Sequence, residues 1–478
     1  MKNFLRLSML FLFTIKIATA QVINIDSILQ AAMFEKHVPG LSALILKKGI
    51  PVWQNNYGYA RIEDSIPVTE NTMFMLASIS KTFISTAVMH AFEDGGINLD
   101  ADINTYLPFE IHNPNYPDEI ITLRQLLTHT SSLQDNWTVL SLGYTFGYDS
   151  PVTLGDFMKG YFVPGGAWYS ESGNFYDEKP GTAYHYCNEG AALAAYILES
   201  IEGISFADYT QAKIFDPLCM NNTSWFLSGA DTFNVAMPYR WKDGDYLANG
   251  YYCYPDYPNG QLRTSVISLA KFLAMIMNNG SWNGQQILSQ SSIDATFSLQ
   301  VPNLDSTQGI IWYQYVIGDR TCWGHSGGDA GVSTNMYFSP KDSTGIITLT
   351  NGNNFYLDGP LDALFDYAEG LEPLPGDSFT CYGFPTNVTA ATLPNNTLSL
   401  YPNPASDYFM MEFSTNENED LLIVMKNNLG QSVYFSSEKN AAKDFKKEIL
   451  IPQLNDGIYF LEVKTAHKVI TRKIVIAH

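Results

Sequence analysis

The pattern of hydrophobic and polar positions predicts strands near both ends of the first 370 residues. Residues 41–59 contain two short strand-like runs around a turn at 47–49, which predicts a hairpin. Residues 332–351 form a second strand-like pair that turns near residues 340–345. The region between these pairs mixes helical patterns with long polar and aromatic loops, of which residues 134–178 are the least readable.

The clearest helical pattern lies early in this region. Its apolar positions recur at helical spacing and stop at Gly95-Gly96; they are Ile79, Phe83, Ile84, Ala87, Val88, Ala91 and Phe92. Residues 357–371 predict a closing helix. Strands at both ends with helices between them predict an α+β domain, with one sheet built from both ends and a helical lobe inserted within it.

After residue 371 the mixed helix and strand pattern ends and is followed by a proline-rich segment and then by short strand-like runs. Residues 372–397 contain four prolines and little periodicity, which predicts a linker. Turn residues then separate short strand-like runs at 407–413, 421–426, 431–435, 447–451, 457–463 and 469–476. We expect residues 398–478 to form a small Ig-like β-sandwich.

The first twenty residues are expected to be a targeting segment. They combine Lys2 and Arg6 with an apolar middle and the sequence A-T-A before Gln21, which predicts a signal peptide over residues 1–20. No later run reaches the roughly 18 apolar residues of a membrane span. We therefore expect an exported chain without a transmembrane helix and with its main domain at residues 21–371.

Composition narrows the classes of partner. The formal charge is −21, so neither nucleic acid nor an anionic membrane is an expected partner. The eight histidines show no ligand spacing, and the cysteines are scattered and lack C-x-x-C spacing; they are Cys187, Cys219, Cys253, Cys322 and Cys381. This pattern predicts neither a zinc site nor a disulfide framework, although one or two bridges remain open in an exported protein.

Ser78 and Lys81 are the first candidates for chemistry. They form S-x-x-K at the start of the predicted helix, where a spacing of three residues puts both side chains on one face. A buried lysine loses part of its basicity, so a neutral Lys81 could take the hydroxyl proton of Ser78. The helix N-terminus would stabilise a developing oxyanion. The motif alone is weak, because residues 436–439 also fit it.

Two further motifs are equally weak alone. Tyr186-Cys187-Asn188 fits Y-x-N, but so do residues 257–259 and 401–403, which resemble turns. His325-Ser326-Gly327 is the only [HK]-[ST]-G sequence in the chain. It precedes a predicted strand, where a backbone N–H could face a substrate carbonyl, but its glycines are also compatible with an ordinary tight turn.

The order of the three motifs is more informative than any one of them. It resembles the serine penicillin-recognising hydrolases, in the branch of class C β-lactamases and D,D-peptidases. Surrounding segments agree, among them "VPGLSALILKKG", "FMLASISKTF", "ITLRQLLTHTSSL" and "KPGTAYHYCNEGAALAAYILESIEG". The resemblance covers residues 23–370 and implies a β-lactamase/transpeptidase-like fold, in which helices flank an antiparallel sheet.

The resemblance also implies catalytic roles. Ser78 would be the acylated nucleophile, and Lys81 and Tyr186 would share general-base and general-acid work. Tyr186 would help most with a phenol pKa well below about 10, which the nearby Lys81 could cause. Backbone N–H groups of Ser78 and Gly328 would form the oxyanion hole.

The remaining motif residues would bind substrate. Asn188 would orient the substrate amide or the lysine. His325, Ser326 and Gly327 would lie along an edge strand. Because Lys81 and desolvation disfavour an imidazolium, we expect His325 to be largely neutral at pH 7.

Three positions depart from the family pattern, and a fourth is expected to have a structural role only. Cys219 stands where glycine is usual, and Cys187 stands where serine or alanine is commoner. His325 replaces the lysine of true β-lactamases, which weakens an antibiotic-resistance interpretation. We expect His129, in the run "LTHTSS", to be a hydrogen-bonded core histidine rather than a catalyst.

The end of the chain has a resemblance of its own. "LSLYPNPASDYFMMEF", "NNLGQSVYF" and "LNDGIYFLEV" resemble the C-terminal sorting domain of the type IX secretion system. This implies the type IX machinery as a partner, export across a Gram-negative outer membrane, removal of the tail, and release or surface attachment. The alternative is an Ig-like binding module that stays on the protein.

The resulting hypothesis is an exported serine hydrolase that forms an acyl-enzyme on Ser78 without a cofactor. The substrate would be a small molecule or a peptide: a D-amino-acid peptide of cell-wall type, an amide or an ester. The alternatives are a penicillin-recognising binding or sensor protein with little turnover, and a true β-lactamase.

Overall fold

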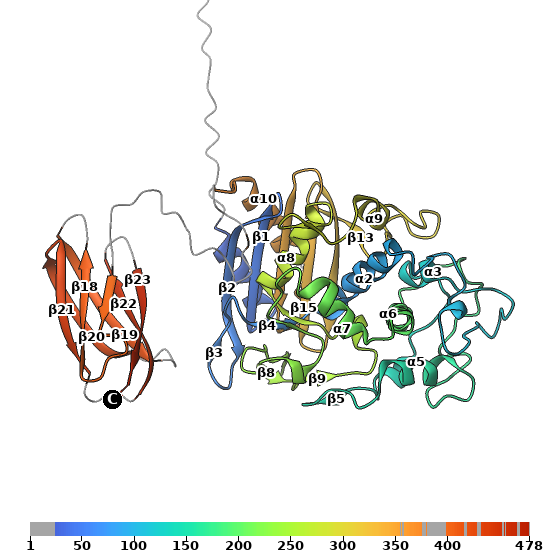
Figure 1. Ribbon diagram of the computed structural model, residues 1–478, viewed down its shortest axis with the longest axis horizontal. Coiled ribbons are helices and arrows are strands. Elements are labelled where there is room, and N and C mark those ends of the chain that lie inside the picture. Colours follow the sequence, from blue (N-terminus) through green and yellow to red (C-terminus); the bar gives the residue numbers. More distant parts are fainter. Residues whose placement is uncertain are drawn as a thin grey trace, which may run out of the picture. The chain divides into compact units, whose positions relative to one another are not determined.

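A computed structural model of the chain describes two compact units, Met1–Thr386 and Asn387–His478 (Figure 1). The described residues are 24–353, 355, 358–374, 379, 398–414, 418–427, 432–451, 454, 456–465 and 469–477. The expected signal peptide and most of the expected linker lie outside them. Each unit is described by itself below.

The larger unit is built on a seven-stranded antiparallel sheet in the order β13-β14-β15-β16-β1-β2-β3. Its strands are β1 (Gly40–Lys47), β2 (Ile50–Arg61), β3 (Ile66–Pro67), β13 (Tyr313–Ile317), β14 (Arg320–Asp329), β15 (Val332–Ser339) and β16 (Thr344–Thr350). β1 pairs with β16 from Leu41 opposite Thr350 to Lys47 opposite Thr344. The predicted sheet from both ends of the region is therefore confirmed, as are both predicted hairpins.

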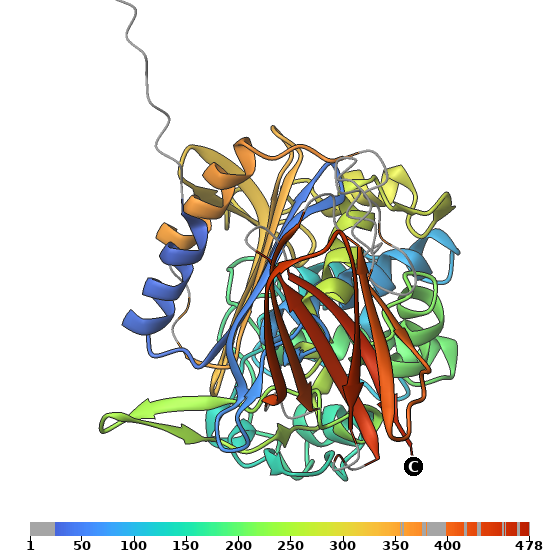
Figure 2. The ribbon, with the colours of Figure 1, turned by 90° about the vertical axis from the view of Figure 1, so that its left-hand side faces the viewer.

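Helices cover both faces of this sheet, so every residue of β1 is buried. Successive side chains of a strand point to opposite faces: Leu44 and Leu46 join one core, while Ala43 and Ile45 join the other. The first core contains residues of α2 (Lys81–Glu93) and α8 (Val266–Met277). The second contains residues of α1 (Ile25–Glu35) and α10 (Asp358–Glu369), which lie together on one side of the sheet in Figure 2.

The remaining elements of this unit form the helical lobe and short strand pairs. The helices are α3 (Leu123–Leu127), α4 (Trp137–Leu140), α5 (Leu154–Phe162), α6 (Asn188–Glu202), α7 (Phe206–Thr210) and α9 (Gln290–Thr296). The short turns are η1 (Ala77–Ser80), η2 (Ile103–Thr105), η3 (Gln211–Phe215), η4 (Leu227–Gly229) and η5 (Tyr257–Asn259). The short strands are β4 (Met73–Met75), β5 (Thr145–Phe146), β6 (Thr223–Ser224), β7 (Tyr239–Lys242), β8 (Asp245–Ala248), β9 (Tyr252–Cys253), β10 (Arg263–Ser265), β11 (Ser281–Trp282) and β12 (Gln285–Gln286).

The second unit contains two antiparallel sheets with the orders β17-β18-β21 and β20-β19-β22-β23. Its strands are β17 (Leu398–Tyr401), β18 (Tyr408–Ser414), β19 (Glu419–Asn427), β20 (Ser432–Ala441), β21 (Asp444–Leu450), β22 (Gly457–Lys464) and β23 (Val469–Ile476). Alternate residues of β18, Phe409, Met411 and Phe413, enter a core that both sheets share. The predicted small β domain is confirmed. The S-x-x-K at residues 436–439 lies within β20, where residues three apart point to opposite faces, so it cannot act as Ser78 and Lys81 do.

Cys219 is disulfide-bonded, whereas Cys187, Cys253 and Cys322 are free and buried; Cys381 lies outside the described residues. Cys219 has φ +53°, a left-handed conformation that suits the glycine usual at this place in the family. Among the described helices, none alone is long and apolar enough to cross a membrane, although the bent pair Asn188–Glu202 and Phe206–Phe215 passes on length and composition together.

Candidate active site

Ser78 lies at the entrance of α2, in the 3₁₀ turn η1 rather than in the first turn of the α-helix itself. The preceding residue, Ala77, has φ +48°, which is strained for a residue with a Cβ. The central sheet holds this turn in place, because Thr334 Oγ1 donates to the carbonyl oxygen of Leu76 at 2.6 Å. The turn presents Ser78 to an open cleft.

Lys81 lies one turn after Ser78, as its spacing predicted. Its Nζ is 3.1 Å from Ser78 Oγ and donates to the carbonyl oxygen of Asn259 at 2.7 Å. The side chain is fully buried, and burial lowers the pKa of Lys81 to about 8, against the opposing effect of the Asp135 and Asp256 carboxylates. When Lys81 is neutral, the short contact reverses and the Ser78 hydroxyl donates to it, which is the arrangement of a nucleophile and its base.

Tyr186 reaches the same pair from the residue before the cap of α6. Its hydroxyl is hydrogen-bonded to Ser78, and Lys81 Nζ lies 5.2 Å from the centre of its ring. The expected lowering of the phenol pKa is wrong in direction. Although 39% of the residue is exposed, desolvation raises the pKa of Tyr186 above its ordinary value, and the hydrogen bond to Ser78 only opposes this. The phenol is thus a neutral hydrogen-bonding group, and Lys81 is the stronger candidate for the base.

Asn188 begins α6 and is anchored by Asp135, which sequence reasoning did not identify. Asp135 Oδ2 accepts from Asn188 Nδ2 at 2.7 Å and from the Asn188 backbone N–H at 3.0 Å. Its other oxygen accepts from the Glu189 backbone N–H at 3.1 Å and faces Cys187 Sγ at 3.3 Å. One carboxylate therefore satisfies the open N–H groups at the start of the helix and fixes the amide of Asn188. Asp135 lies in the loop region 134–178, for which the sequence pattern predicted no secondary structure.

The third motif lies on β14 beside η1. A Cβ at Gly327 would come within 2.1 Å of the carbonyl oxygen of Leu76 and 3.1 Å of the backbone nitrogen of Ser78, so only glycine allows this approach. Gly328 lines the same cleft as Ser78. This neighbourhood is compatible with an oxyanion hole made by two backbone N–H groups.

β14 is not the edge strand of the sheet, because β13 lies beyond it. The expected edge position holds only for residues 325–329, because the pairing of β14 with β13 ends where Gly324 faces Tyr313 and β14 continues beyond that point. There the Tyr313 hydroxyl accepts from the Ser326 backbone N–H at 2.9 Å and lies 2.9 Å from Ser326 Oγ. Tyr313 is a second residue for which the sequence carried no signal.

The rings of His325 and His129 both lie close to Tyr186, with centroids 6.3 Å and 4.4 Å from the centroid of its ring. Burial and the nearby Lys81 charge lower the pKa of each imidazole to about 3, which agrees with the expected neutral His325. His325 Nδ1 donates to the carbonyl oxygen of Ser326 at 2.6 Å. His129 is buried, as expected of a core histidine, and its Nδ1 accepts from the Cys187 backbone N–H, but only this ring nitrogen is satisfied, because Nε2 has no hydrogen-bond partner among the described residues.

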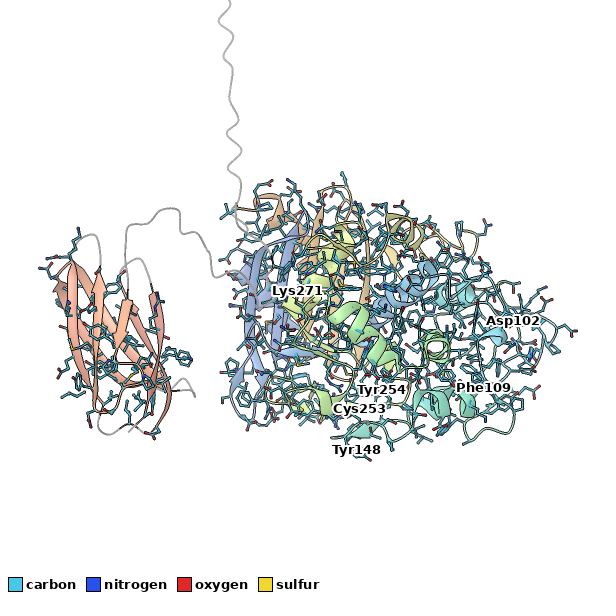
Figure 3. All side chains as sticks on the ribbon, in the orientation of Figure 1. Asp102, Phe109, Tyr148, Cys253, Tyr254 and Lys271 are labelled. Carbon is cyan, nitrogen blue, oxygen red and sulfur yellow. The ribbon has the colours of Figure 1, made fainter. Side chains whose placement is uncertain are left out.

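The cleft beside Ser78 has a volume of about 350 Å³. Its lining residues are Ala77, Ser78, Asp135, Trp137, Leu140, Tyr144, Tyr186, Asn188, Tyr254, Asp256, Asn259, Gly260, Gly328 and Asp329. Tyr254 is labelled in Figure 3, beside Cys253. The lining includes three aspartates and neither lysine nor arginine. In the part of the chain that the structure describes, no group of three or more His, Cys, Asp or Glu side chains is arranged to hold a metal ion.

The comparisons with known proteins agree with this geometry. The Beta-lactamase family model matches residues 25–369, and the model for the secretion system C-terminal sorting domain matches residues 399–477. Protein flp of Staphylococcus aureus (strain MRSA252) is 24% identical over 339 residues, which are 70% of this chain and 64% of that protein. Penicillin-binding protein 4* of Bacillus subtilis (strain 168) is 28% identical over 196 residues, which are 40% of this chain and 38% of that protein. The chain thus spans less than two thirds of either relative.

Solved structures with this fold include two enzymes. The D-amino acid amidase from Ochrobactrum anthropi SV3, complexed with L-phenylalanine amide, has a TM-score of 0.59 at 21% identity, over 72% of this chain and 99% of that one. The D-alanine carboxypeptidase AmpC from Burkholderia cenocepacia has a TM-score of 0.55 at 22% identity, over 73% and 98%. Because the family model spans the sheet, the lobe and all three motifs, the chain belongs to the beta-lactamase family of serine hydrolases, and it ends in a type IX secretion sorting domain.

Proposed function

We propose that the chain hydrolyses an amide or ester substrate through an acyl-enzyme on Ser78. The observation that carries the proposal is the contact of 3.1 Å between Ser78 Oγ and the buried Lys81 Nζ. With the pKa of Lys81 lowered to about 8, part of the lysine is neutral near neutral pH and can accept the hydroxyl proton.

The reaction then follows from the positions of these groups. Ser78 Oγ attacks the substrate carbonyl carbon while its proton passes to Lys81. The carbonyl oxygen becomes negative and faces the N–H groups of Ser78 and Gly328. Collapse breaks the C–N or C–O bond, and the leaving group takes a proton from Lys81, directly or through the Tyr186 hydroxyl. Water then attacks the ester carbon, which releases the acid and restores Ser78.

Electrostatics support a substrate without a carboxylate near the scissile bond. Asp256 and Asp329 line the cleft, His325 is neutral, and the lining contains no lysine or arginine that could bind an anion. This favours neutral amides or esters over β-lactams, whose carboxylate would meet like charges. The D-amino acid amidase with this fold is complexed with L-phenylalanine amide, a ligand that likewise carries no carboxylate.

The sorting domain indicates type IX secretion and a secreted or cell-surface location. We propose that residues 1–20 direct the first export step across the inner membrane of a Gram-negative cell. The tail from Leu398 is then removed during passage through the type IX machinery.

The test is covalent labelling of Ser78. A fluorophosphonate or a fluorescent penicillin should add one adduct, located at Ser78 by peptide mass spectrometry, and Ser78→Ala should remove it. Turnover of nitrocefin, p-nitrophenyl esters and D-Ala-D-Ala peptides then assigns the substrate class. Labelling of another serine in Ser78→Ala would refute the proposed nucleophile, and labelling of Ser78 without turnover of any of the three substrate classes would favour a sensor.

A further inference from the structure

Two carboxyl groups meet behind the catalytic lysine. Glu189, in the first turn of α6, is fully buried, and Asp256, just before η5, is 8% exposed. No N–H or hydroxyl donor of the described residues reaches either oxygen of Glu189. The group against Glu189 is the Asp256 carboxyl, and two carboxyls form a hydrogen bond only when one of them carries a proton.

The surroundings assign that proton to Glu189. Burial raises the pKa of Asp256, but its Oδ2 accepts from Asn259 Nδ2, and this hydrogen bond favours the charged form. Glu189 has no comparable donor, and burial together with the neighbouring Asp256 and Asp135 raises its pKa well above the ordinary range. Glu189 is therefore the donor and Asp256 the acceptor, as in other pairs of carboxyls that share one proton.

Asn259 connects this pair to the nucleophile. Its side chain donates to Asp256, while its backbone carbonyl accepts from Lys81 Nζ at 2.7 Å. The Asp256 carboxylate also opposes the loss of charge that burial imposes on Lys81. The contacts thus form one continuous series from Glu189 through Asp256, Asn259 and Lys81 to Ser78.

We infer that Glu189 and Asp256 are a positioning pair for the Ser78 reaction: sharing one proton, they hold Asn259 against Lys81 and supply the negative charge that Lys81 faces. This inference rests on the proposed function, because it assigns Lys81 the role of base. In this role neither Glu189 nor Asp256 touches the substrate carbonyl; both act through Asn259 and Lys81.

Other titratable groups also face this region. Lys81 is surrounded by Asp135, Asp256, Glu189, Cys187, Tyr186, His129 and His325, and the carboxyl pair by Asp135, Asp329, Tyr144, Tyr161, Tyr254 and Lys81. Burial lowers the pKa of both histidines and raises the pKa of the tyrosines, so these groups are uncharged near neutral pH, and Asp135 and Asp256 are the groups that most oppose the lowering of the Lys81 pKa. Substitutions that neutralise Glu189 and Asp256 must therefore have different effects on the pKa of Lys81, because only Asp256 is charged.

The measurement is the second-order rate constant for labelling of Ser78 by a fluorophosphonate, from pH 5 to 10, on the full chain. In the wild type we expect the rate to rise with a midpoint near the Lys81 pKa of about 8. Glu189→Gln retains a donor toward Asp256 and removes no charge, so its rate should stay within about twofold with the same midpoint. Asp256→Asn removes the charge that raises the lysine pKa, so its midpoint should fall by about one pH unit.

Two further variants separate positioning from folding. Glu189→Leu removes the donor, and we expect labelling to slow by about tenfold, a loss that Glu189→Gln does not show. Glu202→Gln, an exposed carboxyl on the same helix, is the matched control and should behave as wild type. If Asp256→Asn does not fold, the difference in labelling rate between Glu189→Gln and Glu189→Leu still tests the positioning role.

The inference is overturned if Glu189→Gln moves the midpoint as far as Asp256→Asn does, because Glu189 would then be charged. It is also overturned if Asp256→Asn folds and leaves the midpoint in place, or if Glu189→Leu labels as fast as Glu189→Gln. Those results would leave the Ser78 acyl-enzyme intact. Absence of any Ser78 labelling in the wild type would instead refute the proposed function and this inference with it.

Discussion

Asp135 Oδ2 accepts two hydrogen bonds from Asn188, at 2.7 Å from its side-chain nitrogen and at 3.0 Å from its backbone nitrogen. One N–H of the Asn188 amide is thus bound by Asp135, which leaves the amide oxygen and the second N–H to orient the substrate or Lys81. This contact joins the loop after α3 to the start of α6, and it fixes the side chain that follows Tyr186 in the motif.

The first prediction concerns this anchor. Asp135→Ala leaves the N–H groups of Asn188 and Glu189 without their acceptor, which should cost roughly 2 kcal/mol of folding free energy and lower the melting temperature by about 4 °C. Labelling of Ser78 should slow as well, because Asn188 loses its orientation. Calorimetry and labelling rates measure the two effects. Asp118→Ala, at an exposed position outside the cleft, is the control, and equal behaviour of the two variants would contradict the anchoring role.

The second prediction concerns pH and stability. A buried histidine with a pKa of about 3 stays neutral in the folded state, while the unfolded chain protonates near 6.5. The unfolded state therefore binds more protons between these values, and stability falls as the pH drops below about 6.5. His325 should contribute about 2 kcal/mol of this loss between pH 7 and pH 5.

Urea unfolding of wild type and His325→Gln at pH 7 and pH 5 tests this point. All eight tryptophans precede residue 387, so their fluorescence reports on the larger unit alone. The variant should lose less stability on acidification than the wild type. If both lose the same amount, His325 is not held neutral by its surroundings.

The third prediction concerns substrate charge. We expect the N-acetyl form of D-alanine p-nitroanilide to be hydrolysed with a kcat/KM at least about tenfold higher than the N-succinyl form, because the added carboxylate meets the aspartates of the cleft. Asp329→Asn should narrow this ratio, since Asp329 is the cleft aspartate that follows Gly328. Asp118→Asn should leave it unchanged. A wild type that prefers the succinyl form at pH 8 would support a carboxypeptidase or β-lactamase instead.

The fourth prediction concerns the sorting domain. Intact-mass measurement of the protein collected outside the cell should give a chain that lacks the tail from Leu398. Deletion of residues 398–478 should leave the enzyme in the periplasm. A full-length chain through His478 in the medium would instead favour a binding module that stays on the protein.

Local sequence pattern was sufficient to predict much of the fold and the first two catalytic residues. The hairpins at 41–59 and 332–351 were predictable because short strand-like runs stand on both sides of turn residues; β1, β15 and β16 are buried along their whole length, so the apolar run rather than an alternation carried the signal. The spacing of Ser78 and Lys81 was enough to place them together, because the geometry of one turn depends only on residues three apart. The order of the three motifs then identified the family. The pattern did not predict β13, and it did not predict β14 either: only the family resemblance placed residues 325–327 on a strand, because the glycines of β14 interrupt any regular alternation.

The tertiary structure alone decided the electrostatics of the site. Lys81 and Asn259 are 178 residues apart in sequence yet 2.7 Å apart in space, and Asp135 reaches Asn188 across a separation of 53. A pKa depends on desolvation by whichever groups the fold brings near, so the raised value for Tyr186 contradicted an expectation drawn from Lys81 alone. Sequence spacing carries information about neighbours along the chain, whereas burial and charge at a site are set by residues that only the packed fold makes neighbours.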